Sequence, residues 1–202
     1  STVVATPGDS TAQGSWKIDK KSHIVCKTGV PVKSTVLRSV AALIGDESPH
    51  KSAFANGTMT YTYLAVNDYH RFHFPVGGTV REVRVIPGDV ASGGFITWDR
   101  KTKRYAFDSK TPGWQTIETR GLVILETEKH GLVALLPVGM SQMASVRFED
   151  AVRPGAVVRK GDMAGYFLFG GSGVVMVFQG KAGFRLTVPR EGDGTYRHVL
   201  AG

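Results

Sequence analysis

Short apolar stretches alternate with polar positions along most of the chain, and glycine, proline and aspartate separate them. Residues 59–64, Met-Thr-Tyr-Thr-Tyr-Leu, alternate with a period of two, which is typical of a strand. Weaker forms of this pattern predict strands at residues 79–86, 121–126, 131–136, 145–148, 174–178 and 184–188. Most of the 25 glycines lie at turns, which favours many short strands over long helices.

One segment, residues 34–44, has helical spacing instead. Its apolar residues recur every three to four positions, Ser34 can cap its start and Gly45 can close its end. A single helix among many strands predicts a mainly β fold. We expect an antiparallel β-sandwich or partly closed barrel, with one or two short helices, as a single domain over residues 1–202.

The segment Thr97–Arg120 is polar but carries four large aromatic residues. Long segments of this kind are often lids or binding loops, whereas a surface hairpin supported by aromatic side chains explains the composition equally well. Both interpretations stay open. The aromatic residues are Trp98, Tyr105, Phe107 and Trp114.

The charge balance narrows the range of partners. Lysine and arginine number 25 against 17 aspartates and glutamates, a formal charge of +8, which favours anionic partners. No nucleic-acid-binding motif accompanies this charge, so we expect no nucleic acid, and an anionic membrane surface becomes the candidate. The longest apolar run, residues 164–178, is too short and too interrupted by glycine to span a bilayer. We expect a cytoplasmic or peripheral membrane protein without a transmembrane segment in this chain.

Two histidines stand three positions apart, His70 and His73. Residues three apart in an extended segment point to opposite sides, so the two need not share one task. No third ligand stands at a suitable spacing, and Cys26, the only cysteine, excludes a zinc site built on paired cysteines. We therefore expect no metal. The other histidines lie in polar surroundings and are expected at the surface: His23, His50, His130 and His198.

Ser172 lies in a Gly-Gly-Ser-Gly sequence inside an apolar stretch. Flanking glycines let another group approach closely, and a hydroxyl near a base and a carboxylate is the arrangement of an activated serine. The nucleophile elbow Gly-x-Ser-x-Gly is not matched, because Val174 occupies its last position. A hairpin turn is the ordinary explanation of such a sequence. Asp9, which follows Pro7-Gly8, is likewise a turn residue on its own pattern.

Several motifs follow one another along nearly the whole chain: Phe54-x-Asn-Gly-Thr58, Asp68-Tyr-His-Arg-x-His-x-Pro75, Ile86-Pro-Gly-Asp-Val90, Val138-Gly-Met140, Lys160-Gly-Asp-x-x-Gly165 and Phe167-x-Phe-Gly-Gly-Ser172. In this order they resemble the phosphatidylserine decarboxylase family. The resemblance implies a zymogen that cuts itself by serinolysis and a pyruvoyl cofactor made from its own chain, with no metal and no pyridoxal phosphate. It also agrees with a strand-rich catalytic domain. Because the sequence opens directly on a motif, we expect a further segment upstream.

By matching position, Ser172 resembles the residue that becomes the pyruvoyl group. Cleavage is then expected between Gly171 and Ser172, giving a β chain of residues 1–171 and an α chain of residues 172–202 that stay partners. His73 resembles the maturation base and Asp9 the carboxylate that orients it. His70 resembles the histidine beside the substrate during decarboxylation. Substrate-contacting residues are expected at Phe72, Val138, Gly139 and Met140.

The resemblance implies that an amino-acid moiety loses its carboxylate through a Schiff base, with phosphatidylserine giving phosphatidylethanolamine in phospholipid biosynthesis. Gly170-Gly-Ser-Gly173 departs from the Leu-Gly-Ser-Thr of many members, and Glu118-Thr-Arg120 stands near the family's Asn-Glu-Arg. In these departures the sequence is similar to a soluble branch of the family. Decarboxylation of a free aromatic amino acid such as tryptophan is therefore an alternative. A serine hydrolase with the same triad and a non-enzymatic binding module are others. The sequence specifies no oligomeric state.

Overall fold

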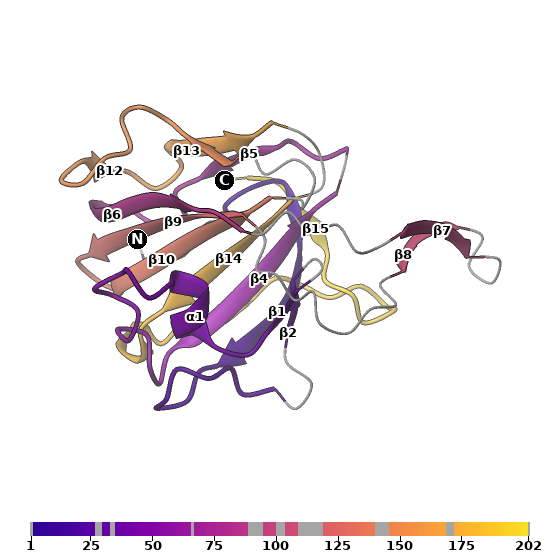
Figure 1. Ribbon diagram of the computed structural model, residues 1–202, viewed down its shortest axis with the longest axis horizontal. Coiled ribbons are helices and arrows are strands. Elements are labelled where there is room, and N and C mark those ends of the chain that lie inside the picture. Colours follow the sequence, from indigo (N-terminus) through magenta and orange to yellow (C-terminus); the bar gives the residue numbers. More distant parts are fainter. Residues whose placement is uncertain are drawn as a thin grey trace.

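The computed structural model describes residues 2–26, 30–32, 35–65, 67–88, 95–99, 104–108, 119–139, 146–168 and 172–201. Antiparallel strands dominate these residues, and their only α-helix has five residues. The mainly β, antiparallel fold predicted from the sequence is therefore confirmed (Figure 1).

Eight strands form the largest sheet, in which every neighbouring pair is antiparallel. The sheet is open, with short strands at its two edges. Its spatial order is β12 (Val157–Val158), β6 (Gly78–Ile86), β9 (Arg120–Thr127), β10 (Gly131–Val138), β14 (Ser172–Phe178), β4 (Thr58–Leu64), β1 (Ser10–Lys17) and β15 (His198–Val199).

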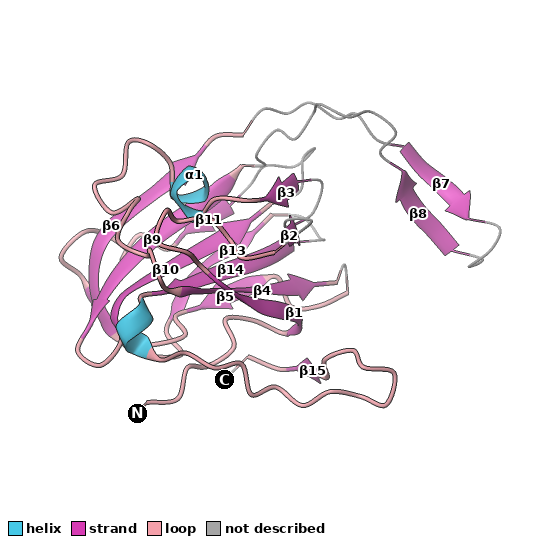
Figure 2. Ribbon diagram, turned by 90° about the horizontal axis from the view of Figure 1, so that it is seen from below, coloured by secondary structure: helices cyan, strands magenta, loops and turns pink. Residues whose placement is uncertain are grey.

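A second sheet of three strands covers part of the first (Figure 1). Its order is β11 (Val146–Phe148), β13 (Met163–Phe167) and β5 (Arg71–His73). Two hairpins complete the strands, β2 (Val30–Val32) with β3 (Thr35–Leu37) and β7 (Phe95–Asp99) with β8 (Arg104–Asp108). The β7–β8 hairpin stands away from the sheets in both views (Figure 2). The aromatic segment thus contains a hairpin, while Trp114 lies outside the described residues.

Strand β14 is buried on both faces, so it reads as a continuous apolar run instead of an alternating one. Val175 and Val177 belong to one core cluster, which also holds Leu43 and Ile44. The intervening residues, among them Val174, belong to the other cluster, which lies under the three-stranded sheet. The two faces of the large sheet thus support two separate cores, as successive side chains of a strand require.

The predicted helix is shorter than expected. Helix α1 spans Val40–Ile44, and Ser39 caps it by accepting a hydrogen bond from Ala42 N at 3.3 Å. Residues 35–37 form β3 instead, because Thr35 and Val36 are β-branched and can pair with β2. Ser34, the expected cap, lies outside the described residues. In the part of the chain that the structure describes, no helix is long and apolar enough to cross a bilayer.

Most predicted strands are present, with ends shifted by one or two residues. The prediction of a strand at residues 184–188 is wrong, because this segment has no strand partner. Phe184 instead stacks its ring on Phe178, with centroids 4.1 Å apart. The apolar character of residues 184–188 is therefore explained by packing against the sheet. A 3₁₀ turn, η1 (Gly180–Ala182), connects β14 to it.

Arg120, the first residue of β9, is a buried cation beneath α1 and only 3% exposed. Its Nε donates to the carbonyl of Leu43 at 2.6 Å, and its Nη2 donates to that of Ala42 at 3.2 Å. These carbonyls lie in the last turn of the helix, where intrahelical partners run out. Burial, with a smaller effect from Arg84, lowers the pKa of Arg120 to about 10, so the side chain is charged at neutral pH.

Replacing Arg120 with methionine should leave these helix carbonyls without their donor. We expect Arg120→Met to lower the free energy of unfolding by about 2 kcal/mol, because buried acceptors lose charged hydrogen bonds. Urea denaturation measures the change. Arg81→Met is the matched control, since Arg81 is half exposed and paired with Glu126, and it should cost below about 1 kcal/mol. Equal losses in both variants would contradict the role given to Arg120.

Candidate active site

Ser172 is the first residue of β14 and is fully buried. It pairs with Leu64 of β4, and the next residue, Gly173, pairs with Val138 of β10. The serine thus stands at the head of a central strand, and the strand begins within the sequence predicted as a turn. Gly171, the other side of the expected cleavage bond, lies outside the described residues.

Gly173 is required by its neighbour Tyr61. A Cβ at position 173 would lie 2.5 Å from the Tyr61 ring and 2.7 Å from its hydroxyl oxygen, closer than real contacts allow. Tyr61 therefore fills the space that a side chain would take beside Ser172. Close packing of the Tyr61 ring therefore explains why residue 173 is a glycine.

His70 is the histidine in contact with Ser172. Its Nδ1 lies 3.1 Å from the Ser172 Oγ, across a sequence separation of 102 residues. The backbone carbonyl of His70 accepts a hydrogen bond from Phe167 N at 2.9 Å, which ties it to the end of β13. His70 therefore lies between the end of β13 and the start of β14. Which of the two side chains donates depends on the imidazole tautomer.

His73, the last residue of β5, makes a different contact. Its Nδ1 lies 2.9 Å from the carbonyl oxygen of Gly161. A carbonyl only accepts, so Nδ1 carries the proton and Nε2 carries the lone pair of the neutral ring. The ring also stacks against Tyr69, with centroids 5.9 Å apart. The tautomer needed for a base at Nε2 is thus fixed by the Gly161 carbonyl.

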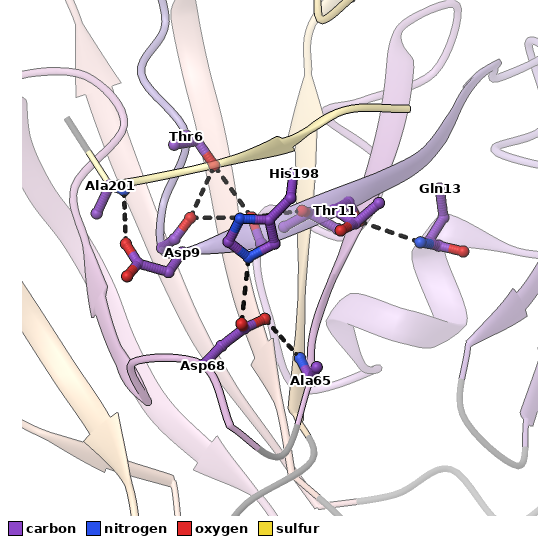
Figure 3. Close-up of polar contacts among 11 residues, drawn as sticks. Thr6, Asp9, Thr11, Gln13, Ala65, Asp68, His198 and Ala201 are labelled. Atoms are coloured by element: carbon purple, nitrogen blue, oxygen red, sulfur yellow. Dashed lines mark hydrogen bonds and ion pairs between the residues drawn. The ribbon is translucent and has the colours of Figure 1, made fainter. Parts of the chain in front are cut away.

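Asp9 lies at the end of a turn that three buried or half-buried hydroxyls support. Ser10 Oγ donates to Gly8 O at 2.9 Å and accepts from Thr62 Oγ1 at 2.7 Å, while Thr6 Oγ1 donates to the same carbonyl at 3.0 Å. The Asp9 carboxylate accepts a hydrogen bond from Ala201 N at 2.8 Å (Figure 3).

Asp9 and His73 line one cavity of about 430 Å³. The two segments are joined through the backbone, because His73 N donates to Pro7 O at 2.7 Å. The structure therefore brings these residues to one cavity and brings His70 to Ser172. The imidazole of His73 is bonded by Gly161, which takes the place expected for Asp9.

The expected substrate-contacting residues have different environments where the structure describes them. Phe72 is fully buried and packs edge-on against Phe148, with ring centroids 5.9 Å apart, so it belongs to the core under His70. Val138 pairs with Gly173, and Gly139 N donates to Thr119 O at 3.1 Å. Met140 lies outside the described residues.

The sequence did not predict the contact between two polar residues, Asp68 and His198. Asp68 Oδ1 lies 3.1 Å from His198 Nε2, and Asp68 Oδ2 accepts from Ala65 N at 2.7 Å. No local pattern could reveal a pair 130 residues apart. His198 is partly exposed as expected, but the prediction of a surface position is wrong for His130, which is 8% exposed. Burial, and then the charge of Lys129, lowers the pKa of His130.

Among the residues that the structure describes, no group of three or more histidines, cysteines, aspartates and glutamates is arranged to hold a metal ion.

Comparisons with known proteins give relatives over most of the chain. Phosphatidylserine decarboxylase proenzyme 2 of Oryza sativa subsp. japonica is 36% identical over 144 residues, which are 71% of this chain and 21% of the relative. The phosphatidylserine decarboxylase proenzyme of Chlamydia muridarum is 33% identical, covering 71% of this chain and 43% of the relative. That of Fusobacterium nucleatum subsp. nucleatum is 35% identical, covering 62% and 38%. The chain spans less than half the length of these relatives.

A family model described as phosphatidylserine decarboxylase matches residues 1–198. Because this match covers nearly all of the 202 residues, the chain belongs to the phosphatidylserine decarboxylase family.

Proposed function

We propose that this chain is the self-processing, pyruvoyl-dependent catalytic domain of a phosphatidylserine decarboxylase, which converts phosphatidylserine to phosphatidylethanolamine. One observation carries the proposal: the buried Ser172 Oγ stands at the head of a central strand, 3.1 Å from a histidine nitrogen. The relatives' names, which are those of decarboxylase proenzymes, support it.

In the proposed maturation, His73 approaches Ser172 and its Nε2 takes the hydroxyl proton, whereas His70 is the histidine in contact with Ser172 in this structure. The oxygen attacks the Gly171 carbonyl carbon, and the peptide C–N bond breaks as an ester forms. Loss of the Ser172 α-proton then expels the Gly171 carboxylate and leaves dehydroalanine, which water hydrolyses to a pyruvoyl group and ammonia. The products are residues 1–171, ending in a carboxylate, and residues 172–202, beginning with the ketone.

A pyruvoyl group at position 172 fits the residues present, because its precursor side chain is buried and has a proton carrier within reach. When formed, the group supplies a ketone that condenses with the substrate amine and accepts electrons as CO₂ leaves. We propose that His70 delivers the proton that replaces CO₂ on the substrate. Its contact with Ser172 Oγ supports this placement beside the reacting atoms.

Three exposed apolar side chains near the site support a lipid substrate. Tyr69 is 45% exposed and adjoins His70, Leu168 is 46% exposed and follows Phe167, and Leu200 is 69% exposed on the cavity of Asp9 and His73. Solvent-exposed leucine and tyrosine around a polar site suit contact with acyl chains and headgroups. Together with the charge of +8, they favour a peripheral position on an anionic membrane surface.

Mutation of the serine tests self-processing directly. Wild-type protein should give two fragments that break before residue 172 in denaturing mass spectrometry, and the shorter one should react with hydrazine. Ser172→Ala should stay whole, because it lacks the attacking oxygen. Ser15→Ala, an exposed serine on β1, is the control and should be cut like wild type. An intact, hydrazine-inert wild-type chain is incompatible with the proposal.

The two histidines should separate into two steps. His73→Ala should slow cutting by about 100-fold, the usual contribution of a general base. His70→Ala should still be cut, yet lose about 100-fold in CO₂ release, since the cut chain lacks its proton donor. Gel densitometry and ¹⁴CO₂ capture measure the two steps, with His23→Ala as control. An uncut His70→Ala beside a cut His73→Ala would assign the base to His70.

The substrate class can be tested on the cut protein. Phosphatidylserine in anionic vesicles should release CO₂ faster than free serine or free tryptophan at equal concentration. Added salt should lower the vesicle rate, because it screens attraction between the basic chain and the lipid surface. Faster release from a free amino acid would reject the lipid substrate while leaving the decarboxylase chemistry in place.

A further inference from the structure

The last residues of the chain return to the wall of the active site. Strand β15 pairs with the edge of β1, where Val199 is opposite Ser10 and His198 is opposite Thr11. Figure 3 shows that His198 and Ala201 point toward two carboxylates of the site wall, Asp68 and Asp9. We call residues 198–201 the C-terminal segment.

The first contact acts on the turn that precedes His70. Asp68 Oδ2 accepts from Ala65 N at 2.7 Å, and Asp68 N donates to Ala65 O at 2.9 Å, which closes the turn. His198 Nε2 lies 3.1 Å from the other carboxylate oxygen. The Asp68 side chain is 16% exposed, so its contact with this imidazole is partly shielded from solvent. Only Tyr69 separates Asp68 from His70, so the turn sets where that imidazole stands.

The second contact acts on the cavity of His73. Ala201 N donates to Asp9 Oδ1 at 2.8 Å, and Leu200 and Ala201 line the cavity together with His73. One short segment thus holds a carboxylate on each side of the histidine string. The two bonds end on Asp68, two residues before His70, and on Asp9, which lines the same cavity as His73.

We propose that the C-terminal segment is a positioning element of the active site, with His198 as a positioning residue for His70 through Asp68. This rests on the proposed function, because it assigns the segment a part in the decarboxylation step. After cutting, the segment belongs to the chain that begins at residue 172. The fragment that begins at residue 172 would then carry the pyruvoyl group and also hold the turn before His70. His70 itself belongs to the other fragment, residues 1–171.

Three variants of the cut protein test this step. His198→Ala removes the donor to Asp68, and we expect kcat for CO₂ release to fall about three- to tenfold with KM within about twofold, because substrate binding groups stay in place. His198→Gln keeps an N–H donor and should restore most of kcat. Arg197→Ala is the control, since Arg197 pairs with Glu191 within the same region and should leave kcat unchanged.

Hydrogen exchange gives a readout that needs no activity. In the uncut Ser172→Ala chain, the Ala65 and Asp68 amides should exchange faster after His198→Ala, and His198→Gln should restore protection. Unchanged exchange and unchanged kcat overturn the proposal. Faster exchange with unchanged kcat limits the segment to a structural role and also overturns it. If wild type neither cuts itself nor releases CO₂, the proposed function fails, and the exchange result still shows whether the segment orders the turn.

Discussion

The pairing of β14 with strands on both of its sides is the constraint on which the site depends. β10 hydrogen-bonds one edge and β4 the other, and the side chains of β14 are buried on both faces. Ser172 cannot shift along or across the sheet without breaking these ladders, and Tyr61 closes the space beside the next residue. The Ser172 Oγ held in this way lies 3.1 Å from His70 Nδ1. The backbone hydrogen bonds of the sheet therefore fix the position of Ser172.

The same strand accounts for how a chain cut before residue 172 would stay assembled. The short fragment would begin with an inner strand and end with the edge strand β15, with β4 and β1 of the long fragment between them. Its release would expose Val174 to Phe178, each contributing about 1.5–3 kcal/mol of burial, and would break both ladders. A cut at the start of β14 thus removes one covalent bond and leaves the packing that positions its new end.

The parts of this structure that depend on local pattern could be predicted from the sequence. The alternation at residues 59–64 gave β4, and the apolar run after Ser172 gave the buried strand β14. The predicted helix was too long because residues 35–37 pair with β2 as a strand. The spacing of apolar residues does not reveal such pairing. Residues 184–188 were assigned a strand because apolar packing on the sheet produces a similar pattern. His198 could not be linked to Asp68, since their contact depends on how the whole sheet is ordered.

The spacing of the two histidines explains why they have different neighbours. Residues 70 and 73 are an odd number apart in an extended segment, so their side chains leave it in opposite directions. One direction leads to Ser172 at the head of β14, and the other leads to the Gly161 carbonyl and the cavity of Asp9. Each imidazole is therefore held in place by a different segment. The Gly161 carbonyl does this directly for His73, whereas His70 depends on a turn whose carboxylate reaches the other end of the chain, so its position is coupled to a more distant part of the fold.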